Sequence, residues 1–275
     1  MRYGKKSHPC RKLLVRALRD GSYLERGMGG RKATTGGELC VFRQIFSFKP
    51  HPYMINQKFS TFKNYLKEAA INRGLILDSI NPFFRFMCSW LFEKYGIKKD
   101  AKIIDVGAGP GMFLITVYDA GYKNISAVDR DDYFFDSFKS RFGFNCYKQD
   151  MDFEPLPFEN ESVDVIFNSF VIAHLKSPDN FLSESYRVLK PNGIIFTITP
   201  DWQKQYKTFW RDPTHIHPYD KTGLARLLLM YGFKPEIYSW GCAFGLGRIE
   251  AYKWAPQLGL IGGNILAVGH KDKLS

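Results

Sequence analysis

The residues best placed to bind a ligand lie at positions 105–111, where one acid, Asp105, precedes three alternate glycines. Apolar residues occupy positions 103, 104 and 106, and a largely apolar run follows at 112–117. This pattern predicts a strand, a tight glycine turn and a helix, with backbone N–H groups at the helix start approaching a ligand. The stretch is therefore expected to be the binding end of a βα unit.

The spacing of the glycines indicates which nucleotide ligand fits. The dinucleotide pattern G-x-G-x-x-G needs a small residue at position 112. Met112 stands there instead, and the third glycine comes one residue earlier, at Gly111. The charge of Asp105, two residues before the first glycine, repels a pyrophosphate and attracts a cationic amino group. The turn therefore argues against a NAD-dependent oxidoreductase.

S-adenosylmethionine (SAM) carries an ammonium and a sulfonium group and no phosphate, so it matches this turn. The string D-x-G-x-G-x-G at 105–111 resembles motif I of the class I SAM-dependent methyltransferases. Over about residues 101–200 the chain resembles the ubiquinone/menaquinone-type branch of that class. The residues that carry this second resemblance are Asp150, Leu156, Pro157, Phe158, Ser162, Asp164, Val165, His174, Leu175, Glu184, Arg187, Val188, Leu189, Lys190, Pro191 and Gly193.

The resemblance implies a doubly wound, Rossmann-like α/β fold. It comprises a seven-stranded sheet with its last strand antiparallel, helices on both faces, and SAM along the strand ends. In this pattern Asp164 and the pair Glu184 and Arg187 are structural. Val163 replaces the usual Phe and Asn192 the usual Gly, and both changes are conservative for backbone geometry.

The order of elements read from the residues agrees with this fold. Strands that alternate with helices of 10–14 residues are typical of a parallel sheet covered on both faces, and right-handed crossovers make it doubly wound. We expect helices from about 60, at 82–95, 111–120, 131–142, 178–189 and 219–231, and strands at 102–106, 124–128, 145–148, 163–167, 194–199, 235–240 and 264–269.

Cofactor contacts are expected at the carboxyl ends of these strands. Asp129 closes the second strand and can accept both ribose hydroxyls, although an N-cap of the next helix is the alternative. Asp150 can accept from the adenine amine with Met151 against the ring, or be a solvated turn residue. The full set of predicted SAM contacts is Asp105, Gly107, Ala108, Gly109, Gly111, Asp129, Arg130, Asp150, Met151, Asn168 and Phe170.

The residues after the fourth strand bear on the identity of the methyl acceptor. Residues 168–171 lack the two prolines of the [N/D]-P-P-[Y/F] turn by which base amino-methyltransferases resemble one another, so nucleic acid is disfavoured. No cluster of carboxylates and amides suggests a Mg²⁺ site, and no metal is expected. Residues 209–219 contain D-P-T-H-x-x-P-[F/Y], which resembles methyltransferases found with cell-surface glycan biosynthesis, as do residues 224–233 and 254–268.

A hydroxyl acceptor benefits from a base, and imidazole titrates near neutrality. We therefore expect the catalytic group among His215, His174 and His217, with structural hydrogen bonding as the alternative for each. The aromatic residues around them either pack around the cation or fill the core: Phe170, Trp202, Trp210 and Tyr219.

The net charge of +12 is concentrated near the start of the chain. Residues 1–58 hold 13 of the 39 Lys and Arg residues and three of the 27 acids, so the remaining sequence is nearly neutral. We expect three parts: a basic extension at 1–53, a helical cap at 54–98 and a SAM-binding domain at 99–275. The extension is read as disordered, as an organelle-targeting segment or as the product of a wrong start site.

Five scattered cysteines without C-x-x-C pairing favour reduced thiols in a cytoplasmic protein. No uncharged apolar run reaches the roughly 18 residues of a spanning helix, and peripheral membrane contact stays open. The pattern does not indicate an oligomeric state. The sequence thus predicts a SAM-dependent methyltransferase for a small-molecule or glycan-type acceptor, most naturally at oxygen. The alternatives are a quinone or lipid-precursor acceptor, or a SAM-fold binding partner without catalysis.

Overall fold

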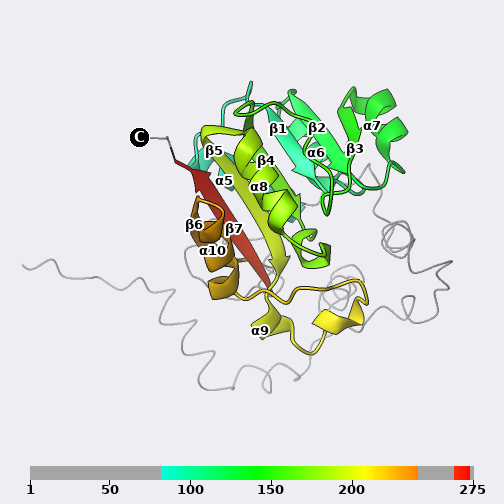
Figure 1. Ribbon diagram of the computed structural model, residues 1–275. Helices are drawn as coiled ribbons and strands as arrows, with labels where there is room; N and C mark the ends of the chain where they lie inside the picture. Colours follow the sequence, from blue (N-terminus) through cyan, green and yellow to red (C-terminus); the bar gives the residue numbers. More distant parts are fainter. Residues whose placement is uncertain (1–81, 241–262, 273–275) are drawn as a thin grey trace, which may run out of the picture. The chain divides into compact units, whose positions relative to one another are not determined.

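The computed structural model of the protein describes residues 82–240 and 263–272 (Figure 1). The predicted helix after residue 60 and the basic extension at 1–53 lie outside the described residues, as do residues 254–258. Within the described ranges no helix combines the length and apolar character needed to cross a lipid bilayer. Cys88 is buried and Cys146 half-buried, and both are free thiols, as expected.

The described residues form a seven-stranded sheet with helices between its strands. The strands are β1 Ile103–Val106, β2 Ile125–Asp129, β3 Asn145–Lys148, β4 Val163–Ser169, β5 Leu189–Pro200, β6 Phe233–Trp240 and β7 Asn264–Lys271. The α-helices are α5 Pro82–Lys94, α6 Met112–Asp119, α7 Phe135–Phe142, α8 Asp179–Val188, α9 Trp202–Gln205 and α10 Lys221–Met230. Two 3₁₀ turns, η2 Ile172–His174 and η3 Phe209–Arg211, follow β4 and α9.

The strand order is β3-β2-β1-β4-β5-β7-β6. β1 pairs in parallel with β2 on one side and with β4 on the other, while β7 runs antiparallel between β5 and β6. The order reverses at β1 and β4, and in such a sheet ligands bind at that switch, beyond the carboxyl ends of the strands. The predicted fold class is confirmed, including the antiparallel last strand.

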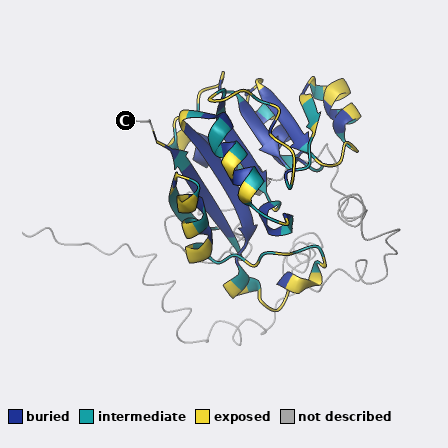
Figure 2. Ribbon diagram, viewed as in Figure 1, coloured by how far each residue is buried: buried dark blue, intermediate teal, exposed yellow. Residues whose placement is uncertain are grey.

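Successive β1 residues point to opposite faces of the sheet, as strand geometry requires. Ile103 belongs to a core that contains Leu91 of α5 and Leu114 of α6, whereas Ile104 belongs to a core that contains Leu182 of α8 and Leu228 of α10. Figure 2 shows the central strands almost wholly buried and the outer face of α8 exposed. Two separate apolar layers therefore hold the sheet.

Two elements begin several residues away from their predicted starts. Helix α7 begins at Phe135 rather than at residue 131, because the N–H of Asp131 donates to Asp129 Oδ1 at 2.9 Å and that of Phe135 to Asp132 O at 3.0 Å, which makes a turn. Strand β5 begins at Leu189 rather than at 194, and β4 shifts its register against it between Val163 and Val165. Pairing with β4 thus extends β5 through residues 191–193, whose Pro-Asn-Gly sequence predicts a break.

The residues predicted to be structural are so in the structure. Glu184 accepts from Arg187 Nη2 at 2.6 Å and from the N–H of Leu156 at 2.8 Å, and the hydrogen bond from Arg187 lowers the pKa of its carboxyl. Asp164 accepts from the N–H of Lys102 and from Lys190 Nζ, both at 2.8 Å. The contacts of Glu184 tie α8 to the loop before β4, and those of Asp164 tie β4 to β5 and to the residue before β1.

Lys271 at the end of β7 is a buried cation that holds two elements together. Its side chain is 4% exposed, and its Nζ donates to Tyr186 O at 2.9 Å and to Leu189 O at 2.7 Å. Glu161 supplies a carboxylate 3.3 Å away. The ammonium therefore satisfies two backbone carbonyls where α8 passes into β5.

Replacing this lysine should destabilise the fold more than replacing an exposed one. We expect Lys271→Met to lower the free energy of unfolding by about 1–3 kcal/mol, because buried carbonyls lose their donor. The matched change Lys190→Met, which breaks a half-exposed ion pair, should lower it by less than about 1 kcal/mol. Urea denaturation of both variants measures this. Equal losses would contradict the role given to Lys271.

Candidate functional site

The three glycines of the β1–α6 loop have a left-handed backbone, but each meets different surroundings. A side chain at Gly107 would collide with Val171, and one at Gly111 with the ring of Phe138. A Cβ at Gly109 would meet nothing within 4 Å. Gly107 and Gly111 are thus required by packing, whereas Gly109 presents open backbone on which a ligand can lie.

The loop is fastened to the end of β2. The N–H groups of Gly107 and Ala108 donate to Val128 O at 2.8 and 3.2 Å, and that of Gly109 donates to Asp129 Oδ2 at 2.8 Å. The other oxygen of Asp129 accepts from the N–H of Asp131 at 2.9 Å. Asp129 therefore supports the loop and caps the following turn, and its predicted contact with ribose would be made by the remaining lone pairs.

Asp105 and Asp129 place two carboxylates near each other at this edge. Asp105 is 3% exposed, and none of the described residues donates a hydrogen bond to its side chain. Desolvation, followed by repulsion from Asp129, raises the pKa of Asp105 well above its usual range. Desolvation also raises the pKa of Asp129, against the N–H groups of Asp131 and Gly109. A cation between them would relieve both effects.

Asn168 adds a second polar atom without a partner. The register of the sheet places it opposite Val106, and its Nδ2 donates to Val106 O at 3.1 Å. Its Oδ1 is buried and has no hydrogen-bond partner within the described residues. Phe170, two residues later, holds a φ of 57°, which is rare for a non-glycine residue. Strain of this kind is concentrated at ligand sites.

The predicted adenine contacts lie at the end of β3, but two of their groups are already engaged. Asp150 Oδ1 accepts from the N–H of Asp152 at 3.0 Å, the turn role given as its alternative. Met151 is buried in the core under α8. Arg130 is exposed, and its guanidinium lies 3.8 Å from Asp131. The contacts of Asp150 and Met151 with adenine, and of Arg130 with SAM, stay predictions.

Taken together, the donors and acceptors at the end of β1 suit SAM. A buried carboxylate without a donor, an amide oxygen without a partner and open backbone at Gly109 form a cradle for an ammonium group. Asp105 and Asn168 would hold that ammonium, and Asp129 is placed for the ribose. A pyrophosphate would meet two carboxylates here, so the geometry disfavours a dinucleotide.

A second group of polar side chains lies on η2 and on the loop after α9. His174 ends η2, and its ring centroid is 4.6 Å from that of His215. His215 Nδ1 lies 2.7 Å from Phe209 O, and His174 Nδ1 lies 3.1 Å from Thr214 O. A carbonyl oxygen only accepts, so each Nδ1 carries the proton and each Nε2 keeps its lone pair.

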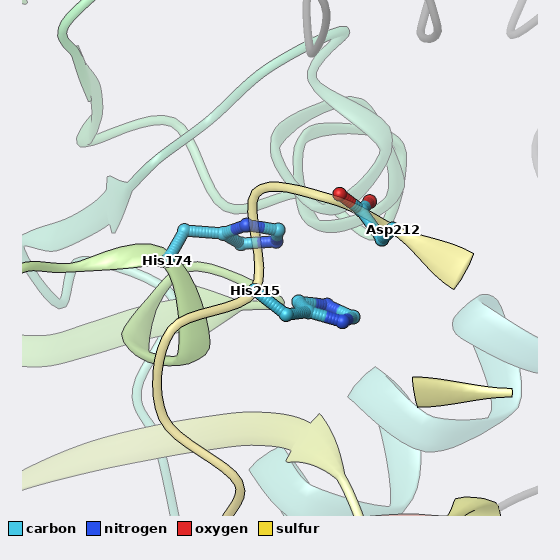
Figure 3. A group of neighbouring side chains, drawn as sticks. All are labelled: His174, Asp212 and His215. Carbon is cyan, nitrogen blue, oxygen red and sulfur yellow. The ribbon is translucent and has the colours of Figure 1, made fainter. Parts of the chain in front are cut away.

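Asp212 completes this group, and sequence reasoning missed it. One donor atom each of His174, Asp212 and His215 can be chosen so that all lie within 4.8 Å of one another (Figure 3). The signal was present in the D-P-T-H string, where an acid precedes His215 by three residues. His174 lies 38 residues before Asp212 in the chain, so only the fold joins them.

His217 does not join the other two histidines. Its Nε2 lies 3.1 Å from Lys176 O, whereas the N–H groups of Ile216 and His217 both donate to Ala173 O, at 2.8 and 3.1 Å. These bonds tie the loop to η2 directly before His174. The structure thus brings together two of the three predicted histidines and gives the third a contact of its own.

The environment of His174 keeps its ring neutral near pH 7. Burial, followed by repulsion from His215 and Arg130, lowers the pKa of His174 below its usual value, against the attraction of Asp212. Since Val171 contacts Gly107 and η2 follows at once, the histidines and the glycine loop occupy the same edge of the sheet.

Comparison with known proteins identifies the domain. A model of the family described as methyltransferase domain matches residues 104–197, which run from β1 into β5. The chain carries a class I, SAM-dependent methyltransferase domain. The predicted class and cofactor are thereby confirmed, while the branch within the class is left open.

Individual proteins are also similar to parts of this chain. The chain is 26% identical over 159 residues to the ribosomal protein L11 methyltransferase of Staphylococcus haemolyticus, covering 54% of this chain and 50% of that protein. It is 33% identical over 90 residues to malonyl-(acyl-carrier protein) O-methyltransferase 1 of Coxiella burnetii, covering 31% and 32%. A SAM-dependent methyltransferase from Archaeoglobus fulgidus shares the fold, with a TM-score of 0.51 and 20% identity over 68% of this chain and 94% of that one. The chain spans about half the length of the first curated relatives it matches.

Removing the Asp129 carboxylate should weaken SAM binding by this methyltransferase domain. We expect Asp129→Ala to lower the affinity more than tenfold, since charge-assisted hydrogen bonds worth about 1.5–3 kcal/mol are lost. Asp129→Asn keeps an acceptor for the N–H of Gly109 but removes the negative charge, so it shows whether loop support or charge accounts for the loss of affinity. Calorimetric titration with SAM measures both, with the exposed neighbour in Asp131→Ala as the control. Unchanged affinity in Asp129→Ala would remove Asp129 from the site.

Asp105 should make stability and SAM binding depend on pH in opposite directions. Its folded pKa is raised, so the ionised carboxyl destabilises the free protein above that pKa, and stability is regained as the pH falls through it. The cationic ligand needs the ionised form, so SAM affinity should fall over the same pH interval. Both effects come from one carboxyl.

The variant Asp105→Asn tests this coupling. We expect it to raise the melting temperature of the free protein at about pH 8 and to weaken SAM binding at least tenfold, with little remaining pH dependence. Melting curves and titrations across pH measure both, and Asp164→Asn, whose carboxyl binds Lys190, is the control. A lower melting temperature together with intact SAM affinity would refute it.

Proposed function

We propose that the protein transfers a methyl group from SAM to a hydroxyl oxygen of a small-molecule or glycan-type acceptor. The observation that carries this proposal is the convergence of His174 and His215 beside the glycine loop, each with Nδ1 bound to a carbonyl. Two imidazoles with free Nε2 atoms are suited to an acceptor that must lose a proton.

The chemistry needs little from the protein besides alignment and proton removal. When bound, SAM supplies an electrophilic methyl group, whose carbon bonds to the acceptor oxygen as the carbon–sulfur bond breaks toward sulfur, and one proton is released. Alignment and exclusion of water provide much of the rate of such a displacement. His174 and His215 face the acceptor hydroxyl and favour the loss of its proton.

The aromatic residues near the histidines support an acceptor with an apolar face. Phe209 stacks on His215 with ring centroids 4.3 Å apart, and Trp210 packs edge-on against both Phe209 and Trp202. Trp210 is 54% exposed and Phe170 is 40% exposed. Exposed aromatic surface beside a few polar groups is typical of a small-molecule site, and the resemblance of residues 209–219 points to glycans.

The name of the Coxiella relative supports oxygen as the acceptor atom, because that protein is an O-methyltransferase. A quinone or lipid precursor would use the same aromatic surface and the same proton transfer. A binding partner without catalysis would retain the SAM cradle and show no turnover. The acceptor class therefore has to be separated by experiment.

The decisive experiment measures transfer of labelled methyl groups from SAM across sugars, lipids and quinone precursors, with the product linkage read by mass spectrometry. We expect a methyl ether with at least one acceptor. His215→Gln should lower turnover by about 10²-fold or more, the typical contribution of a positioned base, with SAM affinity unchanged. His217→Gln, outside the cluster, is the matched control. A nitrogen-linked product, or full turnover in His215→Gln, would refute the proposal.

A further inference from the structure

The three side chains of Figure 3 form a ligand set for a metal ion. Two imidazoles and one carboxylate, His174, His215 and Asp212, offer donor atoms within 4.8 Å of one another, and all three residues are half-buried. A tetrahedral ion with bonds of about 2.0–2.2 Å separates its ligand atoms by roughly 3.3 Å. The ligand atoms would therefore have to move closer together when an ion binds.

The hydrogen bonds behind these side chains orient them as metal ligands are oriented. In metal sites the ring nitrogen that is not a ligand donates to a carbonyl or a carboxylate, which fixes the tautomer. Here Phe209 O accepts from His215 Nδ1 at 2.7 Å, and Thr214 O from His174 Nδ1 at 3.1 Å. In the neutral ring this tautomer leaves the lone pair on Nε2, where a metal ion can bind.

Thr214 links the carboxylate to the same arrangement. Its hydroxyl donates to Asp212 Oδ1 at 2.6 Å, so the hydroxyl oxygen can accept from His174 Nδ1, which lies 3.0 Å away. The N–H of Thr214 also donates to Asp212 Oδ1, at 3.0 Å. Asp212 Oδ1 is thereby occupied, and Oδ2 remains for a ligand. One residue thus orients both Asp212 and His174.

We propose that His174, His215 and Asp212 bind one divalent transition-metal ion, of which zinc is the type, and that this ion holds the acceptor hydroxyl. Imidazole nitrogens with one carboxylate suit zinc and related first-row ions better than Mg²⁺ or Ca²⁺, which prefer oxygen ligands. Three protein ligands leave a coordination position open. The role of the ion at the hydroxyl rests on the proposed function, whereas its binding does not.

The ion, rather than an imidazole acting alone, would favour the loss of the proton from the acceptor hydroxyl. A divalent cation lowers the pKa of a coordinated oxygen, as zinc lowers that of water from 15.7 to about 7. The acceptor proton then leaves to solvent, and the electron pair on oxygen forms the bond to the methyl carbon. The sequence by itself gives the opposite expectation, that no metal is bound.

The binding test uses the full chain, stripped with a chelator and titrated with Zn²⁺ by calorimetry, and with Co²⁺ by absorption spectroscopy. We expect one ion per chain and a higher melting temperature with Zn²⁺. Asp212→Asn, which keeps the acceptor for Thr214, and His174→Ala should each lower the affinity at least tenfold. His217→Ala should bind like the wild type. Should His174→Ala fail to fold, Asp212→Asn and the Co²⁺ spectrum decide.

Absence of stoichiometric binding, or binding that survives both changes, would overturn the site. Methyl transfer by the metal-free and metal-loaded protein then separates the two proposals. Full turnover without metal overturns the role of the ion and leaves the proposed function standing. Specific binding without transfer to any acceptor supports the metal site and refutes the proposed function.

Discussion

The candidate site is organised around two neighbouring acids, because repulsion from Asp129 disfavours the ionised form of Asp105. Asp129 is the last residue of β2 and Asp105 the last but one of β1, and the parallel register of the two strands places both near the same edge of the sheet. Desolvation disfavours a charge on either one, and Asp105 lacks a hydrogen-bond donor among the described residues. A cationic ligand satisfies both, so the site is less stable when empty than when filled. The same two carboxylates that bind the ligand therefore lower the stability of the free protein.

The glycine loop is shaped to keep this edge accessible. Gly107 leaves room for the side chain of Val171 and Gly111 for the ring of Phe138, whereas the space beside Gly109 is open. Packing therefore fixes both ends of the loop and leaves the backbone at Gly109 accessible. The N–H of Gly109 is directed to Asp129, so the acid that awaits the ligand also fixes the loop that receives it. Loop position and ligand charge are therefore coupled.

Much of this could be predicted because the responsible signals are local. The acid and glycines at 105–111 mark β1 and its loop, and strands alternating with helices indicate a doubly wound sheet, a fold class that the structure confirms. The early start of β5 at Leu189 could not be read in this way, because its pairing with Val163 lies across a register shift. Asn192, with a φ of 65°, continues the strand where its neighbours predict a break.

The histidine cluster shows the same limit at the candidate site. His174 and His215 were predicted from their residue type, but type could not show that they meet while His217 contacts Lys176 O. Asp212 was missed because its partner His174 is distant in the chain. Side-chain convergence depends on the bonds from Ile216 and His217 to Ala173 O, which are tertiary and leave no local pattern.

The edge of the sheet thus has two electrostatic parts with different tasks. The acids near the ends of β1 and β2 attract positive charge, whereas burial, together with repulsion from His215 and Arg130, lowers the pKa of His174 at the end of η2. In the proposed reaction, methyl transfer from a sulfonium would remove positive charge at the first part and release a proton at the second. Val171 connects them, because its side chain fills the space above Gly107 and its chain leads directly into η2. The packing of Val171 on Gly107 therefore links the position of the glycine loop to that of η2, which ends at His174.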